Sequence, residues 1–349
     1  MKHTHLLLVC ILLTGSLPMQ AAQHPPLPDQ HRIELLEAFR LAGELGPQIW
    51  PGFELGQPPV LLIVGETEYL LNREKAPDSF AKQEGQRFKS APVFARPRQM
   101  SPAMTAAFPA LGDGVDTVVV GTPQQTQRTP AGWALMVAHE LFHTFQGRRG
   151  LHQKINSLQI GPPEDASWRL GFPFPYSEPD IENALHLLGY SLYRAATLPE
   201  DATQDQLRYD STVAKEAWHN LVRLLELRFG DDRYANYMRY QIANEGVARY
   251  FEHQMAQLAA RGGYKPAAKF ASSQEADPYR KIWDEVYSRQ LYLVKHAGHV
   301  SRSRSEFYGL GHGMALLLDR LNPEWKERYF EAGVWMEDLL PVKLWCKAE

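Results

Sequence analysis

Residues 131–146 form the segment that most limits how this chain can fold. As an α-helix they would carry large apolar side chains around most of the circumference, so the helix must lie inside the protein. The same segment contains two histidines and a glutamate, in the order His139-Glu140-Leu141-Phe142-His143. Polar groups inside a protein cost free energy unless they find partners there. The sequence therefore predicts a buried helix whose polar residues meet partners from other parts of the chain.

The pattern of apolar residues differs on the two sides of this helix. Before it, short β-branched or aromatic runs bounded by glycine and proline predict strands, whereas the polar residues 72–89 predict a loop with a helical piece. After it, apolar residues recur at helical spacing. The predicted strands are residues 60–64, 93–95 and 117–120, and the predicted helices are residues 33–45, 131–146, 181–197, 211–229, 233–260, 277–297 and 305–321, with short helices in 324–340.

These elements predict an α+β fold in two parts. Residues 23–130 form an N-terminal α/β subdomain, whose small mixed sheet packs on the central helix. Residues 131–349 form a mostly α-helical subdomain. We expect a cleft where the two parts meet, which is a common place for a functional site.

The first 22 residues have the pattern of a secretory signal peptide. Lys2 precedes the apolar run 6–13, and small residues follow up to Ala22. That run is far shorter than the roughly 20 residues that a membrane-spanning helix needs. We therefore expect the protein to be exported to the periplasm or secreted, without stable membrane insertion after cleavage. Cys346 is then the only cysteine, so no disulfide can form within the chain.

Several classes of function are disfavoured by composition and missing motifs. The chain has 37 basic and 40 acidic side chains, and this balance argues against a nucleic-acid partner. It also lacks the Gly-x-Ser-x-Gly elbow of many serine hydrolases. The histidine-rich segment remains as the main indication of chemistry.

The spacing of that segment is typical of a zinc site. His139 and His143 are four residues apart, so both imidazoles lie on one helix face and can reach one ion. Glu140 points around the helix, where it can take a proton from a water molecule activated by the metal. A hydrolytic zinc also needs a third protein ligand and one open position.

A second segment carries a resemblance to a known family. The HELFH segment, followed downstream by Asn244-Glu245-Gly246-Val247-Ala248-Arg249-Tyr250, resembles the gluzincin branch of zinc metallopeptidases. Gln146 and Arg149 occupy the positions that would be glycine and histidine in a metzincin, which excludes that branch. The resemblance covers at most about a quarter of the chain.

The resemblance implies a zincin-like fold and a peptide or protein substrate. It implies one Zn²⁺ per chain, bound by His139, His143 and Glu245, with Glu140 as the general base. Gly246 lets another helix or the substrate approach closely.

Two departures from the family pattern leave alternatives open. Glu245 follows His143 by 102 positions, a longer separation than in many gluzincins, so residues 150–230 are predicted to be a helical insertion. Glu182 lies in this insertion and is a rival third ligand, although its context matches the family less well than that of Glu245. Arg249 occupies the position where some gluzincins carry an aspartate that orients a histidine. The candidates for that role are Asp180, Glu182 and Glu252.

Two further features of such peptidases have candidates in this chain. Some gluzincin-type peptidases use a tyrosine or histidine of a later helix to donate a hydrogen bond to the oxyanion. Tyr308 and His312 are the candidates here, and Tyr308 is preferred. Zincin folds also pair an extended substrate with an edge strand that precedes the active-site helix, and residues 117–120 stand in that place.

Two other functions remain compatible with the sequence. The chain can be a non-catalytic envelope protein that binds a partner and holds a structural metal or none. A structural site would have four protein ligands, as when Glu182 and Glu245 both reach the metal. The chain can also be a zinc hydrolase that acts on a non-peptide amide or ester.

Overall fold

The computed structural model describes residues 24–340, except 163–164, 166 and 275–276. The predicted signal peptide (1–22) and Cys346 lie outside the described residues, and the export inferred from the signal stays a prediction. None of the helices in the described ranges is both long enough and apolar enough to cross a membrane.

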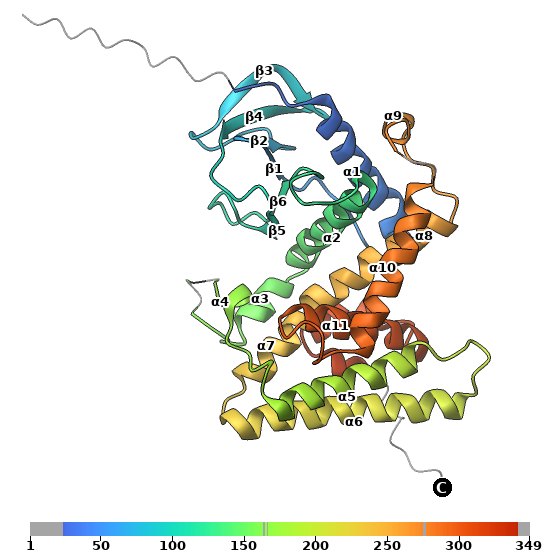
Figure 1. Ribbon diagram of the computed structural model, residues 1–349. Helices are drawn as coiled ribbons and strands as arrows, with labels where there is room; N and C mark the ends of the chain where they lie inside the picture. Colours follow the sequence, from blue (N-terminus) through green and yellow to red (C-terminus); the bar gives the residue numbers. More distant parts are fainter. Residues whose placement is uncertain (1–23, 163–164, 166, 275–276, 341–349) are drawn as a thin grey trace, which may run out of the picture.

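The first part of the chain forms a six-stranded mixed sheet beside helix α1 (Figure 1). The strand order is β3-β4-β2-β1-β6-β5, and only the β1–β6 pair is parallel. In this pair Leu62 lies opposite Val120. The elements are α1 (Asp29–Ile49), β1 (Val60–Val64), β2 (Thr67–Leu71), β3 (Ala81–Phe88), β4 (Ala91–Pro97), β5 (Thr105–Phe108) and β6 (Thr117–Gly121).

The structure corrects two expectations about the sheet. Residues 117–120 form a strand, but β6 lies inside the sheet, and β5 is the edge strand on that side. All of β6 is buried, because β1 and β5 flank it, and its unbroken apolar run is typical of an internal strand. Residues 72–89 contain β3 instead of a helical piece. Most of β3 is exposed at the opposite edge of the sheet. This strand is held by its pairing with β4, and its sequence has no apolar pattern that would predict a strand.

The predicted central helix is present as α2 (Pro130–Arg148). Thr129 caps it, because its side-chain oxygen accepts a hydrogen bond from the backbone N–H of Gly132 at 3.2 Å. The helix packs against α1 and α8 and against β5 and β6, which accounts for its nearly complete burial. Phe142 stacks on Phe251 of α8 with ring centroids 4.4 Å apart, so aromatic packing holds the two helices together.

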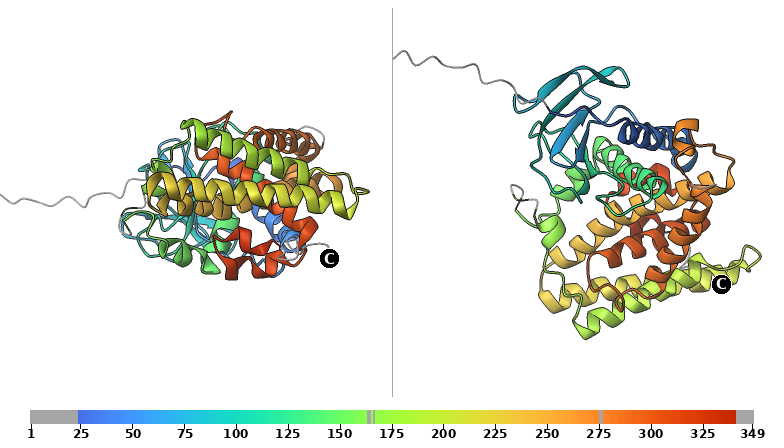
Figure 2. Two further views of the ribbon diagram at one scale, coloured as in Figure 1. Left: turned by 90° about the horizontal axis from the view of Figure 1, so that it is seen from below. Right: turned by 45° about the horizontal axis from the view of Figure 1, so that its top comes forward.

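The rest of the described chain is mostly helical, as expected. Helices α5 and α6 lie side by side at the end of the molecule opposite the sheet, where residues 150–230 were predicted to form an insertion (Figure 2). The elements are α3 (Leu151–Asn156), α4 (Trp168–Gly171), α5 (Pro179–Ala196), α6 (Gln204–Phe229), α7 (Arg233–Gln241), a π-helix (Ile242–Gly246), α8 (Val247–Arg261), α9 (Ala268–Ala271), α10 (Pro278–Lys295), α11 (Ser305–Leu321), α12 (Trp325–Ala332) and a short 3₁₀-helix (Met336–Leu339). The chain is therefore mixed α/β and compatible with the α+β class.

Two glycines allow α11 to cross the π-helix at very short range. A Cβ atom added to Gly311 would lie 2.4 Å from the carbonyl oxygen of Ile242 and 2.6 Å from Cα of Gly246. A Cβ atom added to Gly246 would lie 2.4 Å from Cα of Gly311. The close approach expected at Gly246 is thus made by another helix of the same chain.

Candidate metal centre

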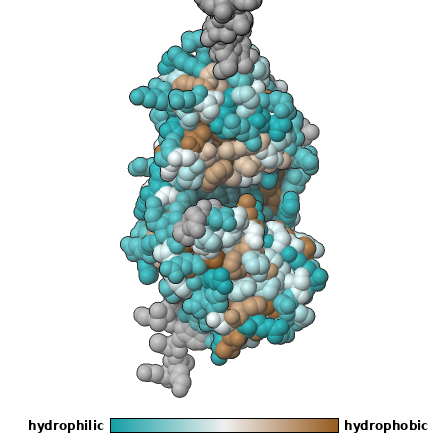
Figure 3. All heavy atoms as spheres, turned by 90° about the vertical axis from the view of Figure 1, so that its left-hand side faces the viewer, coloured by the Kyte–Doolittle hydropathy of each residue, from teal (hydrophilic) through white to brown (hydrophobic). Residues whose placement is uncertain are grey.

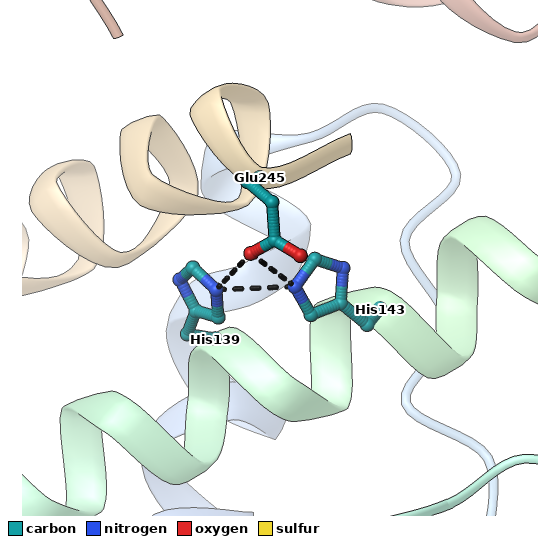
Figure 4. A group of neighbouring side chains, drawn as sticks. All are labelled: His139, His143 and Glu245. Atoms are coloured by element: carbon teal, nitrogen blue, oxygen red, sulfur yellow. Dashed lines mark hydrogen bonds and ion pairs between the residues drawn. The ribbon is translucent and has the colours of Figure 1, made fainter. Parts of the chain in front are cut away.

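Three predicted ligands converge on one point between α2 and the π-helix (Figure 4). The Nε2 atoms of His139 and His143 are 3.1 Å apart. The Oε2 atom of Glu245 lies 3.7 Å from Nε2 of His139 and 3.4 Å from Nε2 of His143. Both histidines are buried, and Glu245 is largely buried, so water competes little for these atoms.

The outer nitrogen of each histidine faces an acceptor. Nδ1 of His139 lies 3.2 Å from a carboxylate oxygen of Glu252, and Nδ1 of His143 lies 2.7 Å from Oε1 of Gln146. Carboxylate and amide oxygens only accept hydrogen bonds, so each Nδ1 carries the hydrogen in the neutral ring. Both Nε2 lone pairs then point toward each other and toward the Glu245 oxygen. Such a convergence of electron pairs could hold a metal ion.

Backbone groups fix the orientation of the Gln146 amide. Its Nε2 donates hydrogen bonds to the hydroxyl of Tyr329 at 2.7 Å and to the carbonyl oxygen of Asn244 at 3.1 Å. The Tyr329 hydroxyl in turn donates to the carbonyl oxygen of Ala243 at 2.6 Å. Because a carbonyl oxygen only accepts, this chain of bonds directs the Gln146 oxygen at His143.

The charges around the centre also favour a cation. Burial raises the pKa of Glu245, but His143 and His139 lower it more, so its pKa lies well below the usual range. Burial lowers the pKa of His143, yet Glu245 raises it more, to about 9. Burial likewise raises the pKa of Glu252, and Arg249 and His139 lower it to about 2. Glu245 and Glu252 are therefore ionised at neutral pH.

The spacing of the three atoms is compatible with a tetrahedral metal ion. Ligand atoms about 2.1 Å from a tetrahedral ion are separated from one another by about 3.4 Å. The three observed separations, 3.1, 3.4 and 3.7 Å, lie around this value. Within the described residues no fourth histidine, cysteine or acidic side chain joins the group. Three protein ligands with one position left are typical of a catalytic rather than a structural site.

A π-helical turn carries the third ligand. The helical stretch from α7 to α8 contains one such turn, Ile242–Gly246, and Glu245 lies within it. Such turns are rare and occur frequently at functional sites. This irregularity was not predicted from the sequence, where residues 233–260 read as one regular helix.

Glu140 and Tyr308 both lie beside the cluster. Glu140 is buried, and this burial raises the pKa of its carboxyl group, which the two histidines partly offset. The ring of Tyr308 is parallel to that of His139, with centroids 6.4 Å apart. Burial and the charge of Glu245 keep the pKa of Tyr308 well above its usual value. Its hydroxyl oxygen accepts a hydrogen bond from Arg304 at 3.0 Å, and a hydrogen bond to Glu245 also contributes to its raised pKa.

The alternatives named from the sequence lie elsewhere. Glu182 accepts a hydrogen bond from Arg302 at 2.7 Å and does not belong to the cluster. Asp180 is exposed on α5. His312 is buried against His253, with Nε2 of His312 3.0 Å from Nδ1 of His253.

Of the three candidates for orienting a histidine, Glu252 contacts His139. Arg249, at the position where some gluzincins have an aspartate, binds Glu252 at 2.5 Å instead. The orienting carboxylate thus lies two helical turns after Glu245 rather than one.

Sequence reasoning missed the roles of Gln146, Tyr329 and Arg304. The sequence contains one indication that Gln146 has a role in the site: it is a polar residue one turn after His143 in an otherwise apolar helix. Tyr329 lies far away in the sequence, in an aromatic segment that indicates only core packing, so nothing local points to it.

We expect the substitution Gln146→Met to weaken zinc binding about 10- to 100-fold. It removes the acceptor that orients His143 while nearly keeping the side-chain volume. Competition with a chromogenic zinc chelator measures the change, and Gln153→Met, at an exposed position, serves as the control. Equal zinc affinity of the Gln146→Met variant and the wild type would show that this amide does not orient the ligand.

Comparison of the chain with protein family models, with curated proteins and with solved structures found no match.

Proposed function

We propose that this protein is a zinc-dependent metallopeptidase of the gluzincin type with a zincin-like fold. The observation that carries the proposal is the convergence of two Nε2 atoms and one carboxylate oxygen, with an acceptor facing each outer imidazole nitrogen. His139, His143 and Glu245 would hold the ion. A bound zinc ion would supply an acidified water molecule and polarise the carbonyl group of the substrate.

The residues around the ion have distinct roles in this proposal. Glu140 takes a proton from the attacking water molecule and later delivers it to the leaving amine. Its raised pKa suits this exchange, because a stronger base accepts the proton more readily. Tyr308 stays protonated and donates a hydrogen bond to the oxygen that becomes negative in the transition state. Glu252 and Gln146 hold the two imidazoles in their metal-binding orientation.

An extended substrate can add to the edge strand β5. In this proposal β5 replaces residues 117–120 as the substrate-binding strand, because no other strand of the described residues pairs with its outer backbone edge. Figure 1 places β5 at the side of the sheet nearest the helical part, and it packs beside α2. Backbone hydrogen bonds to β5 would align a peptide along the helix that carries His139 and His143.

Metal analysis and peptide hydrolysis test this function together. We expect about one zinc ion per chain, measured by elemental mass spectrometry, and cleavage of members of a random peptide library, measured by liquid chromatography and mass spectrometry. The variant His143→Asn loses both, whereas His299→Asn, at an exposed position, keeps both. If the purified protein carries no transition metal and binds none on addition, the proposal fails. Zinc binding with cleavage of esters or small amides, but of no peptide, would favour a non-peptide hydrolase.

A further inference from the structure

A pocket of about 440 Å³ opens beside the metal centre. This volume lies within the range of pockets that enclose small ligands or single substrate groups. Tyr308 lines it, so the pocket shares a residue with the centre. Its walls are Leu170, Phe172, Tyr176, Arg302, Ser303, Arg304, Ser305 and Tyr308. Figure 3 shows hydrophobic side chains gathered across the middle of one face, between the upper and lower parts of the molecule.

The charged residues of the pocket are both arginines. The charge of Arg302 is offset by Glu182, whose Oε1 atom lies 2.7 Å from its guanidinium group. Arg304 differs, because its guanidinium group donates a hydrogen bond to the neutral hydroxyl of Tyr308 at 3.0 Å. Among the described residues no carboxylate lies within ion-pair distance of Arg304. A half-buried guanidinium group without a carboxylate partner favours an anionic ligand, because it can bind a carboxylate through two parallel hydrogen bonds.

Arg304 lies close enough to the metal centre to act on the same substrate. Its guanidinium carbon lies 5.6 Å from the centre of the Tyr308 ring, and that ring is parallel to His139. A group held by Arg304 is thus separated from the metal ligands by one aromatic ring. A residue whose carboxylate binds Arg304 would therefore lie near the metal centre.

The pocket is also lined by aromatic side chains. Phe172 and Tyr176 belong to the segment between α4 and α5, and Phe172 stacks on Tyr237 of α7 with ring centroids 4.5 Å apart. Its ring is therefore held in place by the helical core. A ligand with an apolar part and one negatively charged group would match this pocket, because the apolar part can contact Phe172 and Tyr176 and the charged group can bind Arg304.

We propose that this pocket binds a carboxylate group of the peptide substrate through Arg304, with the apolar part of the same residue against Phe172 and Tyr176. The inference rests on the proposed peptidase function and adds a substrate class to it. The carboxylate is either the C-terminus of the substrate or an acidic side chain. In the first case the enzyme removes residues from C-termini, and in the second it cleaves within a chain beside an acidic residue.

Retention of matched peptides by a hydrolysis-deficient variant tests the proposal. The zinc-loaded Glu140→Gln variant is immobilised, and a library of N-acetylated hexapeptides is passed over it in three forms. The first form has free C-termini, the second has C-terminal amides, and the third has amides with one glutamine replaced by glutamate. Mass spectrometry of the retained peptides gives the relative affinities. Two further columns carry double variants, in which Arg304→Gln or Arg228→Gln is combined with Glu140→Gln. The Arg228→Gln column is the control, because Arg228 is exposed and pairs with Glu178.

Each outcome supports or overturns the proposal. Free acids retained about tenfold more than amides, with the preference lost in Arg304→Gln and kept in Arg228→Gln, would assign the C-terminal carboxylate. A similar preference for the glutamate-containing amides would assign an acidic side chain. No preference for either carboxylate, or one that survives Arg304→Gln, would overturn the proposal. If the binding preference is present but the wild type cleaves no peptide, the peptidase function fails and the carboxylate site stands.

Discussion

The variant Glu140→Gln is expected to lose hydrolysis while it keeps its zinc. Glutamine fills nearly the same volume but cannot accept the proton of the attacking water molecule, so kcat should fall by about a thousandfold or more. His139, His143 and Glu245 are unchanged, and Glu140 is not among the atoms that converge on the metal. Elemental mass spectrometry should therefore still find about one zinc ion per chain.

Two comparisons make this result specific to Glu140. Glu178→Gln changes an exposed glutamate on the surface of the helical part and should leave both hydrolysis and zinc content unchanged. Glu245→Gln should lose zinc as well as activity, because it alters a ligand. Full hydrolysis by Glu140→Gln would show that another group accepts the proton, and loss of zinc from this variant would place Glu140 among the ligands.

The variant Gly311→Ala is expected to cause a large loss of stability in the helical part. Its methyl group would lie 2.4 Å from the carbonyl oxygen of Ile242 and 2.6 Å from Cα of Gly246. Both are backbone atoms, so no side chain can turn away, and α11 and the π-helix must separate. We expect the free energy of unfolding to fall by about 3 kcal/mol, at the upper end of the cost of overpacking.

The same displacement should reach the metal centre. Glu245 precedes Gly246 directly, so movement of that backbone shifts the third ligand, and zinc affinity should fall together with stability. Chemical denaturation and zinc competition measure the two effects. Gly171→Ala is the matched control, because that helical glycine has no neighbour within 4 Å of an added Cβ atom. Equal stability of Gly311→Ala and the wild type would contradict the close crossing of the two helices.

Local patterns were sufficient to predict much of the helical architecture. The bounds of α2 and α11 agree closely with the prediction, because both helices have a continuous apolar pattern and α2 has a Thr-Pro start signal. Strand β3 was missed because an exposed edge strand needs no apolar alternation. Strand β5 was not predicted, and residues 117–120 were wrongly given the edge position, because strand order depends on pairing between distant segments, which no local pattern encodes.

In the candidate site, too, the residues with a local sequence pattern were predicted, and those that depend on distant contacts were not. The spacing of His139 and His143 is local, and the segment around Glu245 has a recognisable pattern, so all three were named from the sequence. The partners that orient them are only partly local. Gln146 lies on the same helix as the histidines, but Tyr329 meets it across 183 positions of the chain. Arg304 and its pocket depend on how α11 lies against the segment after α4, which requires the folded structure.

The bond between Gln146 and Tyr329 has a consequence for biosynthesis. A nascent chain already contains both histidines and Glu245 when residue 245 has been made, but it lacks the hydroxyl that orients the Gln146 amide. Synthesis then has to continue to residue 329, which takes about 4–17 s at the usual rate of translation. During this interval the three ligands exist without their final orientation, and zinc captured early would be held weakly. If the centre binds zinc as proposed, tight metal loading follows the synthesis of α12.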